Sequence, residues 1–117
     1  MNSVFYLNSC NTCTKIIKEL DLGNDFDYRE IKSEPITVYE LEKMFEKTSS
    51  YEALFNKRAI KYRSQGLNNK NLSEADFKQL ILEEYTFLKR PVIFIGEDIF
   101  VGNAKSTIEA AKKALNK

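Results

Sequence analysis

Strand-like patterns occur only near the two ends of this 117-residue chain, and this arrangement restricts the folds that it can adopt. The apolar run over residues 3–7 predicts a buried strand, residues 11–22 predict a helix, and alternating residues 26–31 predict a second strand. The C-terminal end then shows a pattern of strand, tight turn, strand and helix. These elements are expected over residues 92–95, 99–101 and 104–115.

The middle of the chain, at about residues 37–85, has a helical pattern instead. Thr37 and Glu40 have the spacing of a capping box, which predicts a helix over residues 38–47. Further along the chain we expect a short helix, a basic and partly helical stretch, a loop, and a helix from Ser73 to Tyr85. The first three of these are expected over residues 51–55, 56–63 and 66–71.

Strand–helix–strand and strand–strand–helix halves can share one mixed four-stranded sheet, with a right-handed crossover joining the parallel strands. We therefore predict an α/β, thioredoxin-like fold with a helical insertion at about residues 37–85. The length suits a single domain over residues 1–117. Gly23 lies where a glycine commonly ends a helix, so we expect it to end the first one.

The two cysteines, Cys10 and Cys13, lie between the first predicted strand and the first predicted helix. A thiol at a helix N-terminus meets unpaired backbone N–H groups and the positive end of the helix dipole, and both favour the thiolate. We therefore predict a redox centre with Cys10 as the nucleophile and Cys13, one turn further on, as the resolving thiol. Asn11 and Thr12 would lie beside the sulfur and bind substrate or stabilise the thiolate. The alternative is that both cysteines are small buried apolar side chains.

The composition excludes several other chemistries. Histidine is absent, which excludes a histidine base, a Cys–His dyad and zinc motifs that use histidine. Two cysteines supply half of a structural zinc site, so no metal is expected unless two chains share one. With 18 basic and 17 acidic residues, the chain gives no reason to expect direct binding to nucleic acid or to a membrane.

The chain also has no apolar run of the ~18 residues that a membrane-spanning helix needs, and its first residues do not resemble a signal peptide. A cytoplasmic location is therefore expected. In that compartment, a close cysteine pair is more often catalytic or metal-binding than structural.

Arg90 and Pro91 precede the third predicted strand. A proline cannot donate to a strand ladder, so Pro91 marks the start of that strand. In a thioredoxin-like fold a cis proline at this place faces the cysteines, whereas the alternative is a trans proline that only begins the strand. Arg90 would then lie near Cys10. Arg58 is a second candidate because a guanidinium group suits an oxyanion or a thiolate, although a solvated helix face explains it equally well.

The motifs follow one another in the order Ser9–Cys13, Ser33–Thr37, Asn56–Arg58, Leu88–Val92 and Val101–Gly102. In this order they resemble the arsenate reductase (ArsC) family of thioredoxin-like proteins over essentially the whole chain. The resemblance implies that Cys10 is the catalytic cysteine, Arg90 an oxyanion-binding arginine and Pro91 a cis proline. Cys13 and Arg58 match the Spx-like and reductase-like branch of the family.

The resemblance implies a thiol-disulfide oxidoreductase that acts on a small-molecule or protein disulfide without a bound cofactor. Glutathione would serve as co-substrate, or glutaredoxin or thioredoxin as the protein reductant. Asn56 stands where arsenate-reducing members carry an arginine and Asn103 stands near the position of another, so dithiol chemistry is expected in preference to arsenate reduction. The alternative function is a Spx-like, redox-responsive transcriptional regulator that binds RNA polymerase.

Overall fold

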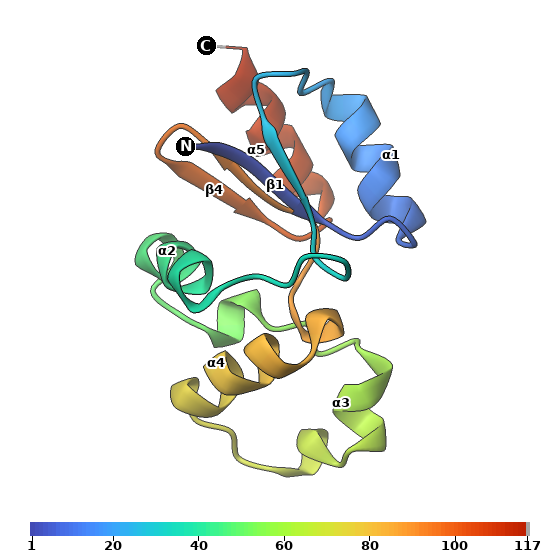
Figure 1. The fold of residues 1–117 in the computed structure, drawn as a ribbon, viewed down its shortest axis with the longest axis vertical. Coiled ribbons are helices and arrows are strands. Elements are labelled where there is room, and N and C mark those ends of the chain that lie inside the picture. The colour runs from blue at the N-terminus through green and yellow to red at the C-terminus, as the bar shows by residue number, and fades with distance from the viewer. Residues whose placement is uncertain (117) are drawn as a thin grey trace. The chain divides into compact units, whose positions relative to one another are not determined.

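The computed structural model describes residues 1–116, which form two compact units. Unit 1 joins the segment Met1–Glu34 to the segment that begins at Arg90, and unit 2 is Pro35–Lys89. Figure 1 shows that the strands belong to unit 1 and that unit 2 is helical. The predicted insertion at about residues 37–85 is therefore confirmed, with a few more residues at each end. The single domain over residues 1–117 stays a prediction.

Unit 1 contains one mixed four-stranded sheet, as predicted, with the strand order β2-β1-β3-β4. Its two inner strands are the apolar ones, which fits their burial on both faces. β1 runs parallel to β2 and antiparallel to β3, and β3 and β4 form the expected hairpin. The strands are β1 (Asn2–Tyr6), β2 (Asp27–Glu30), β3 (Val92–Ile95) and β4 (Asp98–Val101).

Helices α1 (Asn11–Leu20) and α5 (Lys105–Leu115) cover the same face of this sheet. Figure 1 shows them side by side, and Glu19 of α1 pairs with Lys112 of α5 at 2.7 Å between the Oε2 and Nζ atoms. Their apolar sides meet the side chains that β1 and β3 direct to that face. The buried cluster consists of Val4, Ile16, Leu20, Leu22, Phe26, Ile93 and Ala111.

The first helix ends two residues earlier than predicted, and Gly23 does not end it. Asp21 is the C-cap, with a left-handed φ of 51°, and its N–H donates to the carbonyls of Ile17 and Lys18. Aspartate tolerates this conformation better than most residues. Leu22, directly after this C-cap, belongs to the apolar cluster.

Unit 2 begins with the predicted capping box. The Thr37 hydroxyl accepts from the Glu40 N–H, and the Glu40 carboxylate accepts from the Thr37 N–H. The predicted 66–71 loop contains a 3₁₀ turn. The helix predicted to reach Tyr85 ends at Glu83, because Glu84 has an extended backbone and its side chain accepts the Thr86 N–H to cap the following turn. The elements are α2 (Val38–Thr48), η1 (Glu52–Leu54), α3 (Ile60–Ser64), η2 (Leu67–Asn69), α4 (Glu74–Glu83) and η3 (Tyr85–Phe87).

Phe55 is the centre of an aromatic cluster in unit 2. Its ring is 1% exposed and meets the rings of Tyr62, Phe77 and Phe87, with centroids 5.0–5.5 Å away. These three rings come from segments widely separated along the chain, so Phe55 joins η1 to the rest of the unit. The backbone supports this arrangement, since the Lys89 N–H donates to the Leu54 carbonyl.

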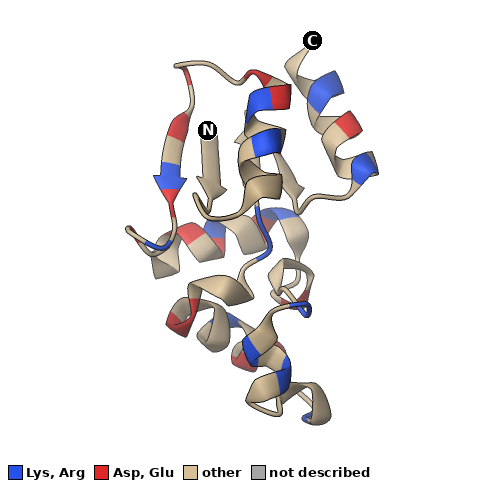
Figure 2. Ribbon diagram, turned by 90° about the vertical axis from the view of Figure 1, so that its right-hand side faces the viewer, with Lys and Arg blue, Asp and Glu red and all other residues tan. Residues whose placement is uncertain are grey.

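Charges of both signs are mixed on the helices of unit 1. Figure 2 shows blue and red segments along both α1 and α5, in agreement with the Glu19–Lys112 pair. Within residues 1–116, the structure contains no helix with both the length and the apolar character needed to cross a membrane.

Replacing Phe55 with alanine should destabilise the protein by about 3–5 kcal/mol, because it removes a buried ring and leaves a cavity among three others. Urea unfolding followed by circular dichroism would measure the change. The control is Ile60→Ala, because Ile60 is 85% exposed and its removal should change the free energy of unfolding by less than about 0.5 kcal/mol. Equal stability losses in the two variants would contradict this account of the core.

Candidate active site

Three chain segments meet at one edge of the sheet in unit 1. The last residue of β1, Tyr6, pairs with the last residue of β2, Glu30, and Phe5 pairs with Val92 at the start of β3. The carboxyl ends of β1 and β2 therefore lie beside the amino end of β3. Cys10 follows β1 by one turn, and Arg90 immediately precedes Pro91 and β3, so the topology brings the predicted nucleophile and arginine to the same edge.

A tight turn connects β1 to α1 and presents Cys10. The Cys10 N–H donates to the Leu7 carbonyl at 3.0 Å, and the Cys10 carbonyl accepts the Thr14 N–H at 3.2 Å. Cys10 is the N-cap of α1, with an extended backbone conformation. Its side chain is partly exposed, whereas Cys13 is fully buried. The predicted placement of the pair, with Cys10 the more exposed, is therefore correct.

The surroundings of Cys10 favour its thiolate. Partial burial raises the pKa of Cys10, but the Cys13 N–H, the Cys13 thiol and the Arg90 guanidinium together outweigh burial and leave that pKa below its ordinary value. The Cys10 sulfur does not close a capping hydrogen bond of the usual geometry, but the Cys13 N–H is directed closely enough to stabilise its charge. Arg90 adds both its charge and a hydrogen bond.

Cys13 has the opposite preference. Burial raises the pKa of the Cys13 thiol to about 12, and the hydrogen bond that it donates to Cys10 adds to this effect. The Leu7 N–H and the Arg90 charge act in the other direction but are weaker. In the reduced protein the pair therefore consists of an accessible thiol whose ionisation is favoured and a buried thiol whose ionisation is disfavoured.

Pro91 lies where the sequence predicts it, and the peptide bond between Arg90 and Pro91 is cis. The Pro91 side chain is fully buried, and its carbonyl accepts the Gly102 N–H at 2.9 Å. This bond fixes the chain directly before β3, from which Arg90 reaches the Cys10 sulfur.

The other predicted site residues have more local surroundings. Asn11 and Thr12 are exposed on the first turn of α1, and the Asn11 carbonyl accepts the Thr14 hydroxyl at 3.0 Å. Arg58 belongs to unit 2, where its N–H donates to the side-chain oxygen of Asn56. The roles of Asn11, Thr12 and Arg58 at the site stay predictions.

Glu30 also lies at this edge, although the sequence alone predicts only that it belongs to an alternating strand. Its carboxylate accepts the N–H of Asn8, two residues before Cys10, at 2.9 Å. It also accepts the N–H groups of Lys32 and Ser33, beyond β2. The sequence shows an acidic residue at the end of this strand. Its position next to the loop that carries Cys10 becomes evident only from the pairing of β1 with β2.

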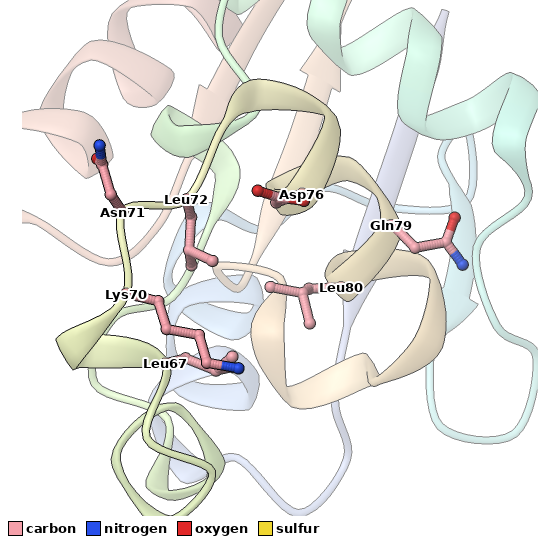
Figure 3. A pocket seen from close by; sticks show the side chains of 7 residues that line it. All are labelled: Leu67, Lys70, Asn71, Leu72, Asp76, Gln79 and Leu80. Atoms are coloured by element: carbon pink, nitrogen blue, oxygen red, sulfur yellow. The ribbon is translucent and has the colours of Figure 1, made fainter.

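A surface cavity of about 340 Å³ lies elsewhere, in unit 2. None of the predicted site residues lines it, and its Asp76 carboxylate already accepts the Ser73 N–H as part of a capping box. No cluster of three His, Cys, Asp or Glu side chains suited to a metal ion occurs within residues 1–116. Figure 3 shows the lining residues Leu67, Lys70, Asn71, Leu72, Asp76, Gln79 and Leu80.

Comparison with known proteins gives similarities along nearly the whole chain. Residues 5–111 match the sequence profile of the ArsC family. The chain is 30% identical over 114 residues to Uncharacterized protein YusI of Bacillus subtilis (strain 168), covering 93% of this chain and 97% of that protein. The solution structure of SACOL0876 from Staphylococcus aureus COL has a TM-score of 0.76 and 27% identity, covering 94% of this chain and 97% of that one. The crystal structure of a possible arsenate reductase from Streptococcus mutans UA159 has a TM-score of 0.72 and 26% identity, with coverages of 90% and 92%.

Replacing Arg90 with methionine should raise the pKa of Cys10, because it removes the neighbouring positive charge and its hydrogen bond. At about pH 7 the thiolate fraction then falls, so alkylation of Cys10 by iodoacetamide should become several-fold slower. The control is Lys15→Met, which removes a positive charge from α1 that is not among the groups shifting the pKa of Cys10. An unchanged rate in Arg90→Met would contradict the role of Arg90.

Proposed function

Because this chain belongs to the ArsC family, we propose that it is a thiol-disulfide oxidoreductase in which Cys10 attacks an oxidised substrate and Cys13 resolves the adduct. One observation carries the proposal: neighbouring groups lower the pKa of Cys10, whereas burial raises the pKa of Cys13 to about 12. This difference supports Cys10 as the nucleophile and Cys13 as the resolving thiol.

The first step is attack by the Cys10 thiolate on one sulfur of a small-molecule or protein disulfide. A new S–S bond forms to Cys10 while the substrate S–S bond breaks, and the other substrate sulfur leaves as a thiolate. Formation of the adduct removes the negative charge of Cys10 that Arg90 and the α1 N-terminus stabilise. The arginine is then available to the departing thiolate, which carries the same charge.

The second step is attack by Cys13 on the Cys10 sulfur. Cys13 gives up its proton to the leaving substrate sulfur or to water, forms the Cys10–Cys13 disulfide and releases the second substrate sulfur, so the substrate gains two electrons and the protein loses them. Two glutathione molecules, or one reduced glutaredoxin or thioredoxin, would return the pair to the dithiol. We place this cycle in the cytoplasm, where these reductants are maintained.

Arsenate is a less suitable substrate in this proposal. A multiply charged oxyanion requires several cationic donors, and Arg90 is the guanidinium next to Cys10. In the resemblance noted above, Asn56 occupies the position of a further arginine and Asn103 lies near the position of another. The Asn56 amide is also engaged locally, because it donates to the Thr86 carbonyl and accepts the Arg58 N–H.

The variant Cys13→Ser should trap the first step. On treatment with glutathione disulfide, its Cys10 should acquire one glutathione and keep it, because the resolving thiol is absent. Intact-protein mass spectrometry would measure the adduct. The matched control is Cys10→Ser, which carries the same substitution at the other position and should form no adduct and show no turnover.

A persistent adduct on Cys13 in the Cys10→Ser variant would reverse the assigned roles. Wild-type protein should oxidise to the Cys10–Cys13 disulfide and be reduced again by glutathione, glutaredoxin or thioredoxin in steady state. Oxidation without turnover by any of the three would contradict an enzyme. It would favour the redox-responsive regulator, for which recovery of RNA polymerase with the oxidised or reduced protein is the direct test.

A further inference from the structure

The carboxylate of Glu30 joins the two loops that follow the parallel strands β1 and β2. Oε2 accepts the Asn8 N–H at 2.9 Å, while Oε1 accepts the N–H groups of Ser33 at 2.8 Å and Lys32 at 3.1 Å. Asn8 lies 22 residues from Glu30 in the sequence and two residues before Cys10. We propose that Glu30 is a positioning residue that fixes the turn from which Cys10 is presented; this inference rests on the proposed function.

The connection between β1 and α1 is so short that a single hydrogen bond to it can restrict its conformation. The Cys10 N–H donates to the Leu7 carbonyl, so residues 7–10 form a β-turn with Asn8 at its second position. That hydrogen bond joins Leu7 to Cys10 and closes the turn, but it does not restrain the backbone of Asn8 between them. The bond from Asn8 to Glu30 supplies this second restraint, because Glu30 is itself paired with Tyr6 in the ladder.

Only a carboxylate satisfies this arrangement. Both of its oxygens accept hydrogen bonds, one for each loop, and an ionised carboxylate carries no donor. A glutamine side chain has one accepting oxygen and one NH₂ donor, so one of the two loops would face a donor instead of an acceptor. The Asn8 N–H, followed by those of Ser33 and Lys32, lowers the pKa of Glu30 and keeps it ionised.

The negative charge of Glu30 cannot itself stabilise the Cys10 thiolate. A negative charge near a thiolate disfavours it, so removal of that charge alone would lower the pKa of Cys10. Arg90 acts on Cys10 directly, and the charged neighbours of Glu30 in the chain are Arg29, which pairs with Glu34 at 3.8 Å, and Lys32. Their charges remain in a Glu30 variant. A positioning role and a charge effect therefore predict shifts of opposite sign in the pKa of Cys10.

The test is Glu30→Gln, with the pKa of Cys10 measured by thiolate absorbance and its alkylation rate measured with iodoacetamide. We expect the pKa to rise and the rate near neutral pH to fall by about 3- to 10-fold, because the Cys13 N–H and Arg90 are no longer held against the sulfur. The matched control is Glu19→Gln, which removes a paired carboxylate from α1 without touching the turn. Its Cys10 pKa and rate should match the wild type.

A second variant separates positioning from general destabilisation. Proline is favoured at the second position of a β-turn, so Asn8→Pro should fix the turn through its own ring while removing the N–H that Glu30 accepts. In the double variant Asn8→Pro with Glu30→Gln, the alkylation rate should return to within about twofold of the wild type. If Glu30 acted through some other part of the structure, proline at residue 8 would not restore the alkylation rate.

Hydrogen exchange of the Asn8 N–H tests the tether without reference to turnover. Its protection should fall by at least about tenfold in Glu30→Gln and remain unchanged in Glu19→Gln. An unreactive Cys10 in the wild type would remove the proposed function but leave this difference in exchange. An unchanged or lowered Cys10 pKa in folded Glu30→Gln, or failure of the proline rescue, would overturn the positioning role.

Discussion

The central position of β1 in the sheet is the constraint on which the candidate active site depends. β1 pairs in parallel with β2 on one side and antiparallel with β3 on the other. This register brings together the ends of β1 and β2 and the start of β3, although residues 30 and 90 are far apart in the sequence. That pairing brings Cys10, Arg90 and Glu30 to the same edge of the sheet. A different strand order would separate them without changing any local motif.

The two cysteines differ because α1 begins between a partly open edge and the apolar cluster. The N-cap position leaves Cys10 accessible and beside N–H groups, while the next turn of the helix directs Cys13 inward. Desolvation acts on both thiols and raises both pKa values, but only Cys10 receives enough donors to reverse the effect. Burial therefore raises the pKa of Cys13, and hydrogen bonding lowers that of Cys10.

Local patterns predicted the local features well. The apolar runs gave the strands, the Thr37 capping box gave the start of α2, and the strand–helix boundary gave the N-cap position of Cys10. Features that depend on tertiary contacts were missed or misplaced. Asp21 rather than Gly23 ends α1, and the next residue, Leu22, packs in the core, a tertiary contact that helix-capping statistics do not contain. The contact between Glu30 and Asn8 depends on which strands are neighbours, so no window of sequence could reveal it.

The absence of histidine determines how reactivity can be controlled at this site. A histidine partner would gain and lose its charge near neutral pH and would make thiolate formation depend on its own titration. Arginine stays protonated throughout that range, and the backbone N–H groups do not titrate at all. Besides the Cys13 thiol, the pKa of Cys10 then depends on how closely the Cys13 N–H and Arg90 are held against its sulfur. The hydrogen bonds that fix the turn before α1 therefore belong to the chemistry of the site as much as the groups that touch the sulfur.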